Sequence, residues 1–145
     1  MQRDGKLVAA GLTRAPGTDS LALARYTTKG RLDSSFGNRG RVVAPGSGAA
    51  SAVAIQADSK ILAAASTFAG SKAAGSLMRY GAGGQVDHGF GQGGKVATGA
   101  VDAIAVQKDG RIVTTGRSLL RYTARGVPIR ALDTAARSRA PSQRW

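Results

Sequence analysis

The chain has 145 residues, which is enough for one ordinary domain with a hydrophobic core and too few for two comfortable ones. It contains no cysteine, no glutamate and one histidine, and its eight acidic residues are all aspartate, so disulfides and thiolate chemistry are excluded and the common acid–base and metal-ligand residues are scarce. The net charge of +13 favours contact with polyanions without defining a binding site.

The composition also indicates the class of secondary structure. Glycine occurs 21 times and long helix-forming residues are few, which favours strands joined by turns. No run of eighteen apolar residues is present, so we expect no membrane span. The first residues lack the long apolar segment of a secretory signal peptide.

In chain order, the first predicted element is the segment 2–11, which reads QRDGKLVAAG. Its Asp-Gly pair predicts a tight turn, and the apolar run after it predicts a strand. Three more short apolar segments follow: LALARY at 21–26, GRVVA at 40–44 and SAVAIQ at 51–56. Because large aliphatic residues alternate with alanine, we expect strands whose two faces are both covered by neighbouring sheets.

A glycine-rich loop, RLDSSFGNRGRVV at 31–43, separates the second and third segments. Asp33 is expected to accept backbone N–H bonds from two or three residues further on and so to close a turn. Phe36 is the large apolar group of the loop, and we expect it to fill the gap between adjacent sheets. Gly37 and Gly40 are expected to supply positive φ angles or close backbone approach.

The same elements return 54 residues later. The first element is repeated by QADSKILAAA at 56–65, the end of the second by LMRY at 77–80, and the loop by QVDHGFGQGGKVA at 85–97. A motif that recurs with the structural period is most simply a structural motif. The second copy of the loop motif consists of Asp87, Phe90, Gly91 and Gly94.

A third copy starts with QKDGRIVTTG at 107–116, but it is truncated. Arg111 and Arg121 are 10 residues apart, whereas their counterparts Lys6 and Arg25 are 19 apart. The predicted parts are therefore unit one at 1–55, unit two at 56–106, a truncated third unit at 107–126, and a basic, loosely ordered tail at 127–145. Four strands in about fifty residues is the size of a propeller blade, so the predicted fold is all-β, a partial β-propeller of about two and a half four-stranded antiparallel blades.

These motifs resemble those of the delta-60 repeat family of bacterial proteins. The resemblance covers residues 1–126 and rests on the patterns Q-x-D-G-K, A-R-Y and D-x-x-F-G-x-x-G at fixed spacing. It implies a propeller-like arrangement of four-stranded blades in long proteins that are often secreted or attached to the cell surface, and it implies no catalytic residues. Met1 stands where Ile55 and Val106 stand in the later copies, so we interpret the chain as a fragment of a larger array.

Each copy carries an Arg-Tyr pair near the end of its second strand, and two interpretations of these pairs remain open. Repeated around a propeller, one set of side chains would line a ring that binds anionic sugars or single-stranded nucleic acid. The favoured interpretation is structural, with tyrosine packed between blades and arginine paired with a turn aspartate. The candidate ligand-binding residues are Arg25, Tyr26, Arg79, Tyr80, Arg121 and Tyr122.

The function predicted from the sequence is a non-enzymatic structural or binding scaffold that needs no cofactor. Its expected partners are further blade repeats, or a second copy of the chain, held through exposed blade faces, with a glycan or a protein as ligand. One alternative is a basic module that binds polyanions, either nucleic acid, which is the less favoured ligand, or glycan. Another is a remnant of a lactonase-like propeller hydrolase, which the absence of glutamate disfavours because such sites use glutamate as a metal ligand.

Overall fold

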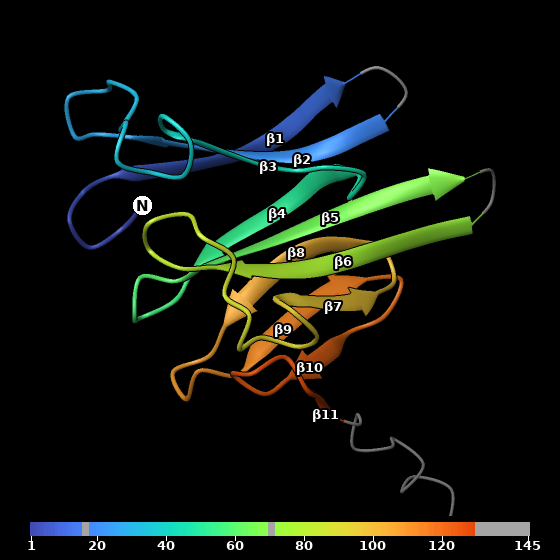
Figure 1. Cartoon of the computed structure of the whole chain (residues 1–145). Helices are drawn as coiled ribbons and strands as arrows, with labels where there is room; N and C mark the ends of the chain where they lie inside the picture. Colours follow the sequence, from blue (N-terminus) through green and yellow to red (C-terminus); the bar gives the residue numbers. More distant parts are fainter. Residues whose placement is uncertain (16–17, 70–71, 130–145) are drawn as a thin grey trace, which may run out of the picture.

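The computed structural model describes residues 1–129 apart from 16–17 and 70–71, and it shows three antiparallel sheets that follow one another along the chain (Figure 1). The first sheet consists of β1 (Leu7–Ala15), β2 (Thr18–Tyr26) and β3 (Arg41–Ala44). The second consists of β4 (Ala49–Ile55), β5 (Ile61–Ala69), β6 (Lys72–Tyr80) and β7 (Lys95–Thr98). The third consists of β8 (Val101–Val106), β9 (Ile112–Gly116), β10 (Leu120–Tyr122) and β11 (Pro128–Ile129).

The predicted Asp-Gly and Asp-Ser turns stand before the first strand of the first sheet and before the second strand of the other two. The aspartate carboxylate accepts the backbone N–H two residues later, from Lys6 to Asp4 at 3.2 Å and from Lys60 to Asp58 at 3.2 Å. The residue between them has a positive φ, which glycine adopts easily and Ser59 adopts at 67°. This local bond fixes the point at which each long strand begins.

The sheets are offset by one strand from the predicted sequence units. Strand β4 belongs to unit 1–55 but pairs with β5, and β8 belongs to unit 56–106 but pairs with β9. The reason is local, because the turn at 56–60 closes with Gln56 N–H donating to the Lys60 carbonyl at 2.8 Å. A tight turn joins antiparallel neighbours, so the SAVAIQ segment opens the next sheet instead of closing its own.

The third sheet extends further along the chain than the sequence predicts. Pro128 and Ile129, which the sequence assigns to a loosely ordered tail at 127–145, form β11 and pair with Tyr122 and Arg121. The third unit is shortened in its hairpin, since β9 and β10 have five and three residues where β5 and β6 have nine each. The remainder of the predicted tail, 130–145, lies outside the described residues.

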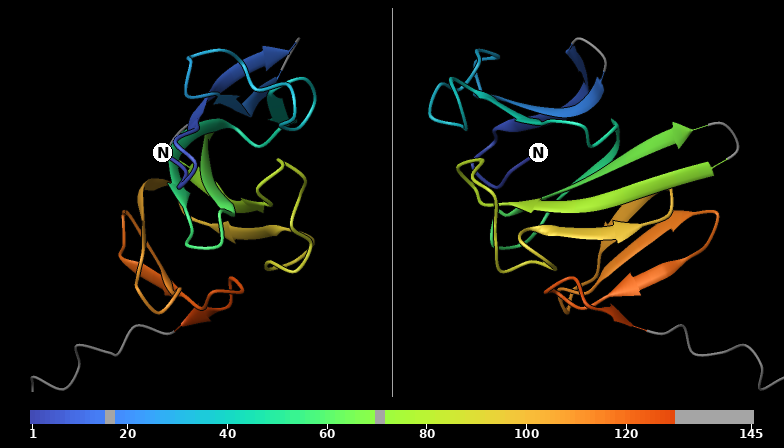
Figure 2. Two further views of the ribbon diagram at one scale, coloured as in Figure 1. Left: turned by 90° about the vertical axis from the view of Figure 1, so that its left-hand side faces the viewer. Right: turned by 45° about the vertical axis from the view of Figure 1, so that its right-hand side comes forward.

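The sheets stack face to face, with the second between the first and the third (Figure 2). Five consecutive residues at the start of β5, 61–65, are all fully buried, because alternate side chains face opposite neighbours. One core cluster between the first and second sheets contains Val8, Leu21, Leu23, Phe36, Ile61, Ala63, Ala65, Met78 and Tyr80. The other, between the second and third sheets, contains Leu62, Ala64, Leu77, Phe90, Val101, Ile112 and Tyr122.

The all-β prediction is confirmed by these three sheets. Within the described residues, no helix is long and apolar enough to cross a membrane.

Candidate functional site at the junctions between sheets

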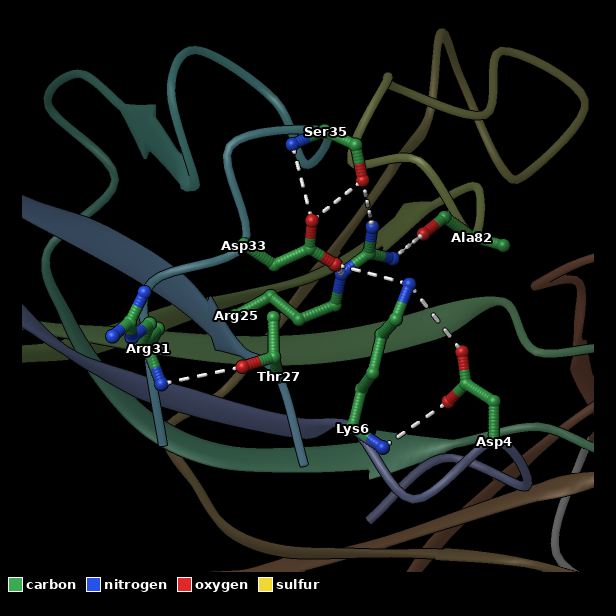
Figure 3. A network of polar contacts seen from close by, with 8 residues as sticks. All are labelled: Asp4, Lys6, Arg25, Thr27, Arg31, Asp33, Ser35 and Ala82. Atoms are coloured by element: carbon green, nitrogen blue, oxygen red, sulfur yellow. Dashed lines mark hydrogen bonds and ion pairs between the residues drawn. The ribbon is translucent and has the colours of Figure 1, made fainter. Parts of the chain in front are cut away.

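The best-defined polar site lies where the first sheet meets the second, and Arg25 is at its centre (Figure 3). Its Nε donates to Asp33 Oδ2 at 2.9 Å, and its Nη2 donates to Ser35 Oγ at 3.1 Å. Its Nη1 donates to the carbonyl oxygen of Ala82, in the turn that follows β6 of the second sheet. Arg25 and Asp33 are 6% and 7% exposed, so they form an almost buried ion pair within the first sheet. The bond to Ala82 links this pair to the second sheet.

Phe36 completes this junction from the same loop. The side chain is fully buried, and the Arg25 guanidinium carbon lies 4.7 Å from the centroid of its ring. The next residue, Gly37, donates its N–H to the Gly83 carbonyl at 2.7 Å. We call residues 33–37 the first plug loop, and the turn at 81–85 that receives it an acceptor turn.

The second junction repeats this arrangement between the second and third sheets. Arg79 Nε donates to Asp87 Oδ2 at 2.8 Å, its Nη1 donates to the Ala124 carbonyl, and its guanidinium carbon lies 4.6 Å from the Phe90 ring centroid. Gly91 N–H donates to the Arg125 carbonyl at 2.8 Å. Residues 87–91 form the second plug loop, and the turn at 123–127 is its acceptor turn.

The two plug loops differ at one position. Where the first has Ser35, whose hydroxyl and N–H both contact Asp33, the second has Gly89, which supplies only its N–H to Asp87, at 3.1 Å. The Asp87 side chain is accordingly 18% exposed, against 9% for Asp33. The first junction is therefore the more completely hydrogen-bonded of the two.

The predicted glycines within and just after both plug loops have positive φ angles. The values are 51° and 53° at Gly37 and Gly91, and 91° and 95° at Gly40 and Gly94. A Cβ at either of the first two would lie 2.3 Å from a backbone carbonyl oxygen, of Arg41 or of Lys95. The chain turns here from the plug loop into the outer strand, in nearly the same geometry in both sheets.

Each plug-loop aspartate also pairs with a lysine from the Asp-Gly or Asp-Ser turn. Lys6 Nζ lies 3.1 Å from Asp33 Oδ2, and Lys60 Nζ lies 3.1 Å from Asp87 Oδ2. Hydrogen bonds from Ser35 and from Lys6 hold the pKa of Asp33 well below its ordinary value. Burial opposes ionisation of Asp87, but the hydrogen bonds from Lys60 and the Gly89 N–H outweigh it and lower the pKa.

These lowered pKa values predict acid sensitivity. A carboxylate whose pKa is lower in the folded than in the unfolded chain stabilises the fold above the unfolded value, about 3.9, and this stabilisation is lost as the pH falls towards the folded value. We expect the urea midpoint to be nearly constant between about pH 5 and pH 7 and to fall below about pH 4. In the Asp33→Asn/Asp87→Asn variant the midpoint should be lower at neutral pH and its decline in acid shallower. If the urea midpoint declined equally steeply with falling pH in the parent chain and in the variant, groups other than Asp33 and Asp87 would control the loss of stability in acid.

The structure does not bring the three Arg-Tyr pairs together into one surface. Arg25 and Arg79 are inside the junctions, and Tyr80 and Tyr122 are 2% and 3% exposed between sheets. Tyr26 is half-buried on the outer face of the first sheet, where it pairs with Leu7. Arg121 is half-buried, and Ile129 stands eight residues after it, at the position where Asp33 and Asp87 follow Arg25 and Arg79. The positions of Arg25, Arg79, Tyr80 and Tyr122 favour the structural interpretation over a ligand-binding ring.

Sequence reasoning missed the acceptor turns and the two lysines. The turns present backbone carbonyls, so their side chains vary, and glycine at 30, 84 and 126 is the shared signal. Lys6 and Lys60 follow the turn aspartate at the same place in each repeat, which is the pattern that could have identified them. Among the described residues, no group of three or more histidines and aspartates is arranged to hold a metal ion.

Comparison with known families agrees with this architecture. Residues 2–36 and 56–90 match the model of a family described as "Domain of unknown function (DUF5122) beta-propeller". Both matched segments end at the phenylalanine of a plug loop, and the second starts 54 residues after the first. A search of curated proteins gave no match. The fold is a partial β-propeller, and its three sheets are consecutive blades.

Proposed function

We propose that this partial propeller is a non-enzymatic structural scaffold whose blades stack with further blades of the same kind. One observation carries the proposal: among the described residues, nothing covers the outer face of the first sheet, although the corresponding faces of the other two sheets are covered. We call this side of each sheet, which in the second and third sheets packs against the preceding sheet, the front face.

The repeat allows a direct comparison of front faces. Ile61 and Ala63 on the front face of the second sheet are fully buried. Their counterparts 54 residues earlier, Leu7 and Ala9, are both exposed, Leu7 by 51%. Val43 is on the same open face and is also 51% exposed. Exposed apolar side chains gathered on one face of a sheet are typical of an interaction surface.

The charged residues at the junctions support a structural role. Each buried arginine is engaged by an aspartate, a carbonyl of the next sheet and an aromatic ring, which leaves its guanidinium unavailable to a substrate. Desolvated and fully paired charges of this kind specify which surfaces meet. The repeat motifs and the recurrence of these paired charges at both junctions also support the proposal that the chain is a delta-60 repeat protein.

The test is the molar mass of the full chain by light scattering, measured over a range of concentrations together with circular dichroism. We expect a β-rich spectrum and a mass that rises above the 14.7 kDa of the monomer with concentration, because the open front face self-associates. The Leu7→Lys/Val43→Lys variant should shift this association to higher concentration. The matched control is Leu119→Lys, at a residue that is 68% exposed in the β9–β10 connection, and it should have little effect.

A folded monomer at every concentration would contradict the stacking role. Retention of that monomer on heparin at moderate salt would favour instead the polyanion-binding module suggested by the net charge of +13.

A further inference from the structure

We propose that the turn at 27–31 of the first sheet is a free acceptor turn, and that it binds the plug loop of one further propeller blade, which carries an arginine and an Asp-x-x-Phe-Gly loop. This inference rests on the proposed scaffold function and names the partner of the open front face. The same molecule contains two occupied examples of the contact, which define what the partner must supply.

The three acceptor turns share one hydrogen-bond pattern. Thr27 N–H donates to the Arg31 carbonyl at 2.7 Å, and Gly30 N–H donates to the Thr27 carbonyl at 2.9 Å. The corresponding bonds are 2.8 and 2.9 Å in the turn at 81–85, and 2.8 and 2.9 Å in the turn at 123–127. The turn at 27–31 is therefore built like the two turns that hold plug loops.

The three turns differ in whether a plug loop is bound to them. In the second and third sheets, the carbonyls at the second and third positions of the turn accept bonds from an arginine and from a plug-loop glycine. In the first sheet these positions are Thr28 and Lys29, both exposed, and no donor from the described residues reaches their carbonyls. Both oxygens are thus accessible to an incoming blade.

The space around the glycine of each turn also distinguishes the free turn from the two occupied ones. A Cβ on Gly84 would lie 2.9 Å from the Phe36 ring, and a Cβ on Gly126 would lie 2.7 Å from the Phe90 ring. A Cβ on Gly30, which has a similar φ of 73°, would meet no atom of the described residues within 4 Å. The space that a phenylalanine fills at the other two turns is open here.

A second copy of this chain does not carry a free plug loop within its described residues. Phe36 and Phe90 are both fully buried in their own junctions, and the turn at 123–127 leads directly into β11. The fitting occupant is therefore another blade whose plug loop is unengaged. That blade also brings a strand for the free edge of β1, since β5 and β9 each pair with a first strand that the first sheet lacks among the described residues.

The chain itself supplies a probe of the required chemistry. Residues 45–106 contain the second sheet, its plug loop and strand β8, and Val106 precedes Gln107, the counterpart of Gln2. Joining 45–106 directly to residues 2–145 therefore adds one blade in the natural repeat spacing. We expect the amides on the free edge of β1 to exchange with solvent at least about ten-fold more slowly in this fusion, and the urea midpoint of the first sheet to rise.

Two variants identify the contact. Phe90→Ala in the added copy alone, and Gly30→Ala in the fusion, should each remove most of the added protection. Gly30→Ala in the parent chain should cost only the backbone strain of its positive φ, because the new methyl group would meet no atom of the described residues within 4 Å. Circular dichroism of each protein establishes whether the added blade is folded.

The inference would be overturned if the β1 amides exchanged equally fast in the parent chain and in the fusion, or if Gly30→Ala had equal effects in both proteins. It would also be overturned if the added blade stayed unfolded, since the proposed contact is what should order that blade. The scaffold proposal is judged separately by self-association of the parent chain. A parent that associates through Leu7 and Val43 while the fusion gains no protection would overturn this inference alone.

Discussion

Replacing Phe36 or Phe90 with alanine is expected to lower the free energy of unfolding by about 3–5 kcal/mol. Both rings are fully buried and each lies between two sheets, so truncation leaves a cavity that neither sheet can close alone. The arginine above each ring also loses its aromatic partner, which adds about 0.5–2 kcal/mol in a desolvated setting. Since domains of this size are stable by about 5–15 kcal/mol in total, either variant should be close to unfolding.

Urea unfolding monitored by circular dichroism measures this loss. Val43→Ala is the control, because it removes an apolar side chain from the open front face, where it is 51% exposed, and it should cost no more than about 0.5 kcal/mol. If Phe36→Ala does not fold, Phe36→Leu keeps most of the buried volume and should give an intermediate loss. A cost for Phe36→Leu no greater than that of Val43→Ala would show that the plug loops do not hold the sheets together.

Much of the fold could be predicted because the repeated elements are recognisable by their side-chain types. The apolar runs of β1, β2 and β3 return in the second sheet with the same spacing, and the alternation with alanine correctly indicated a sheet buried on both faces. The grouping of strands was not predictable in this way. A sequence repeat can be divided at any point, and only the tight turn at 56–60 assigns β4 to the second sheet.

The sequence predicted only one of the two sides of each junction. Its plug side depends on Asp33, Phe36 and a following glycine, which are residue types with distinctive roles, and these recur. Its acceptor side depends on backbone carbonyls, in turns that read TTKGR, GAGGQ and TARGV. Carbonyl acceptors place no demand on side-chain type, so only the glycine is shared and sequence comparison of the three turns carries little signal.

That shared glycine leads to the second large expected effect, a loss of stability on replacing Gly84 or Gly126 with alanine that Gly30→Ala does not share. All three residues have positive φ, at 91°, 82° and 73°, so each substitution carries a similar backbone cost of about 1–2 kcal/mol. At Gly84 the new methyl group would also lie 2.9 Å from both the Gly37 nitrogen and the Phe36 ring. At Gly126 it would lie 2.7 Å from the Phe90 ring and 2.8 Å from a methyl group of Val96. Such overpacking costs about 1–3 kcal/mol more.

The measurement is the urea midpoint of each of the three variants, compared at an equal dependence of the unfolding free energy on urea concentration. The loss in Gly30→Ala gives the backbone cost, which is subtracted from the losses in the other two variants. We expect Gly84→Ala and Gly126→Ala to be similar to one another and clearly less stable than Gly30→Ala. Because the clash lies between sheets, it should also separate the plug loop from its turn and expose Arg25 or Arg79 to solvent. Equal midpoints for all three variants would mean that the loops and turns are not in close contact in solution, and the stacking of the blades would then have to depend on the aliphatic faces alone.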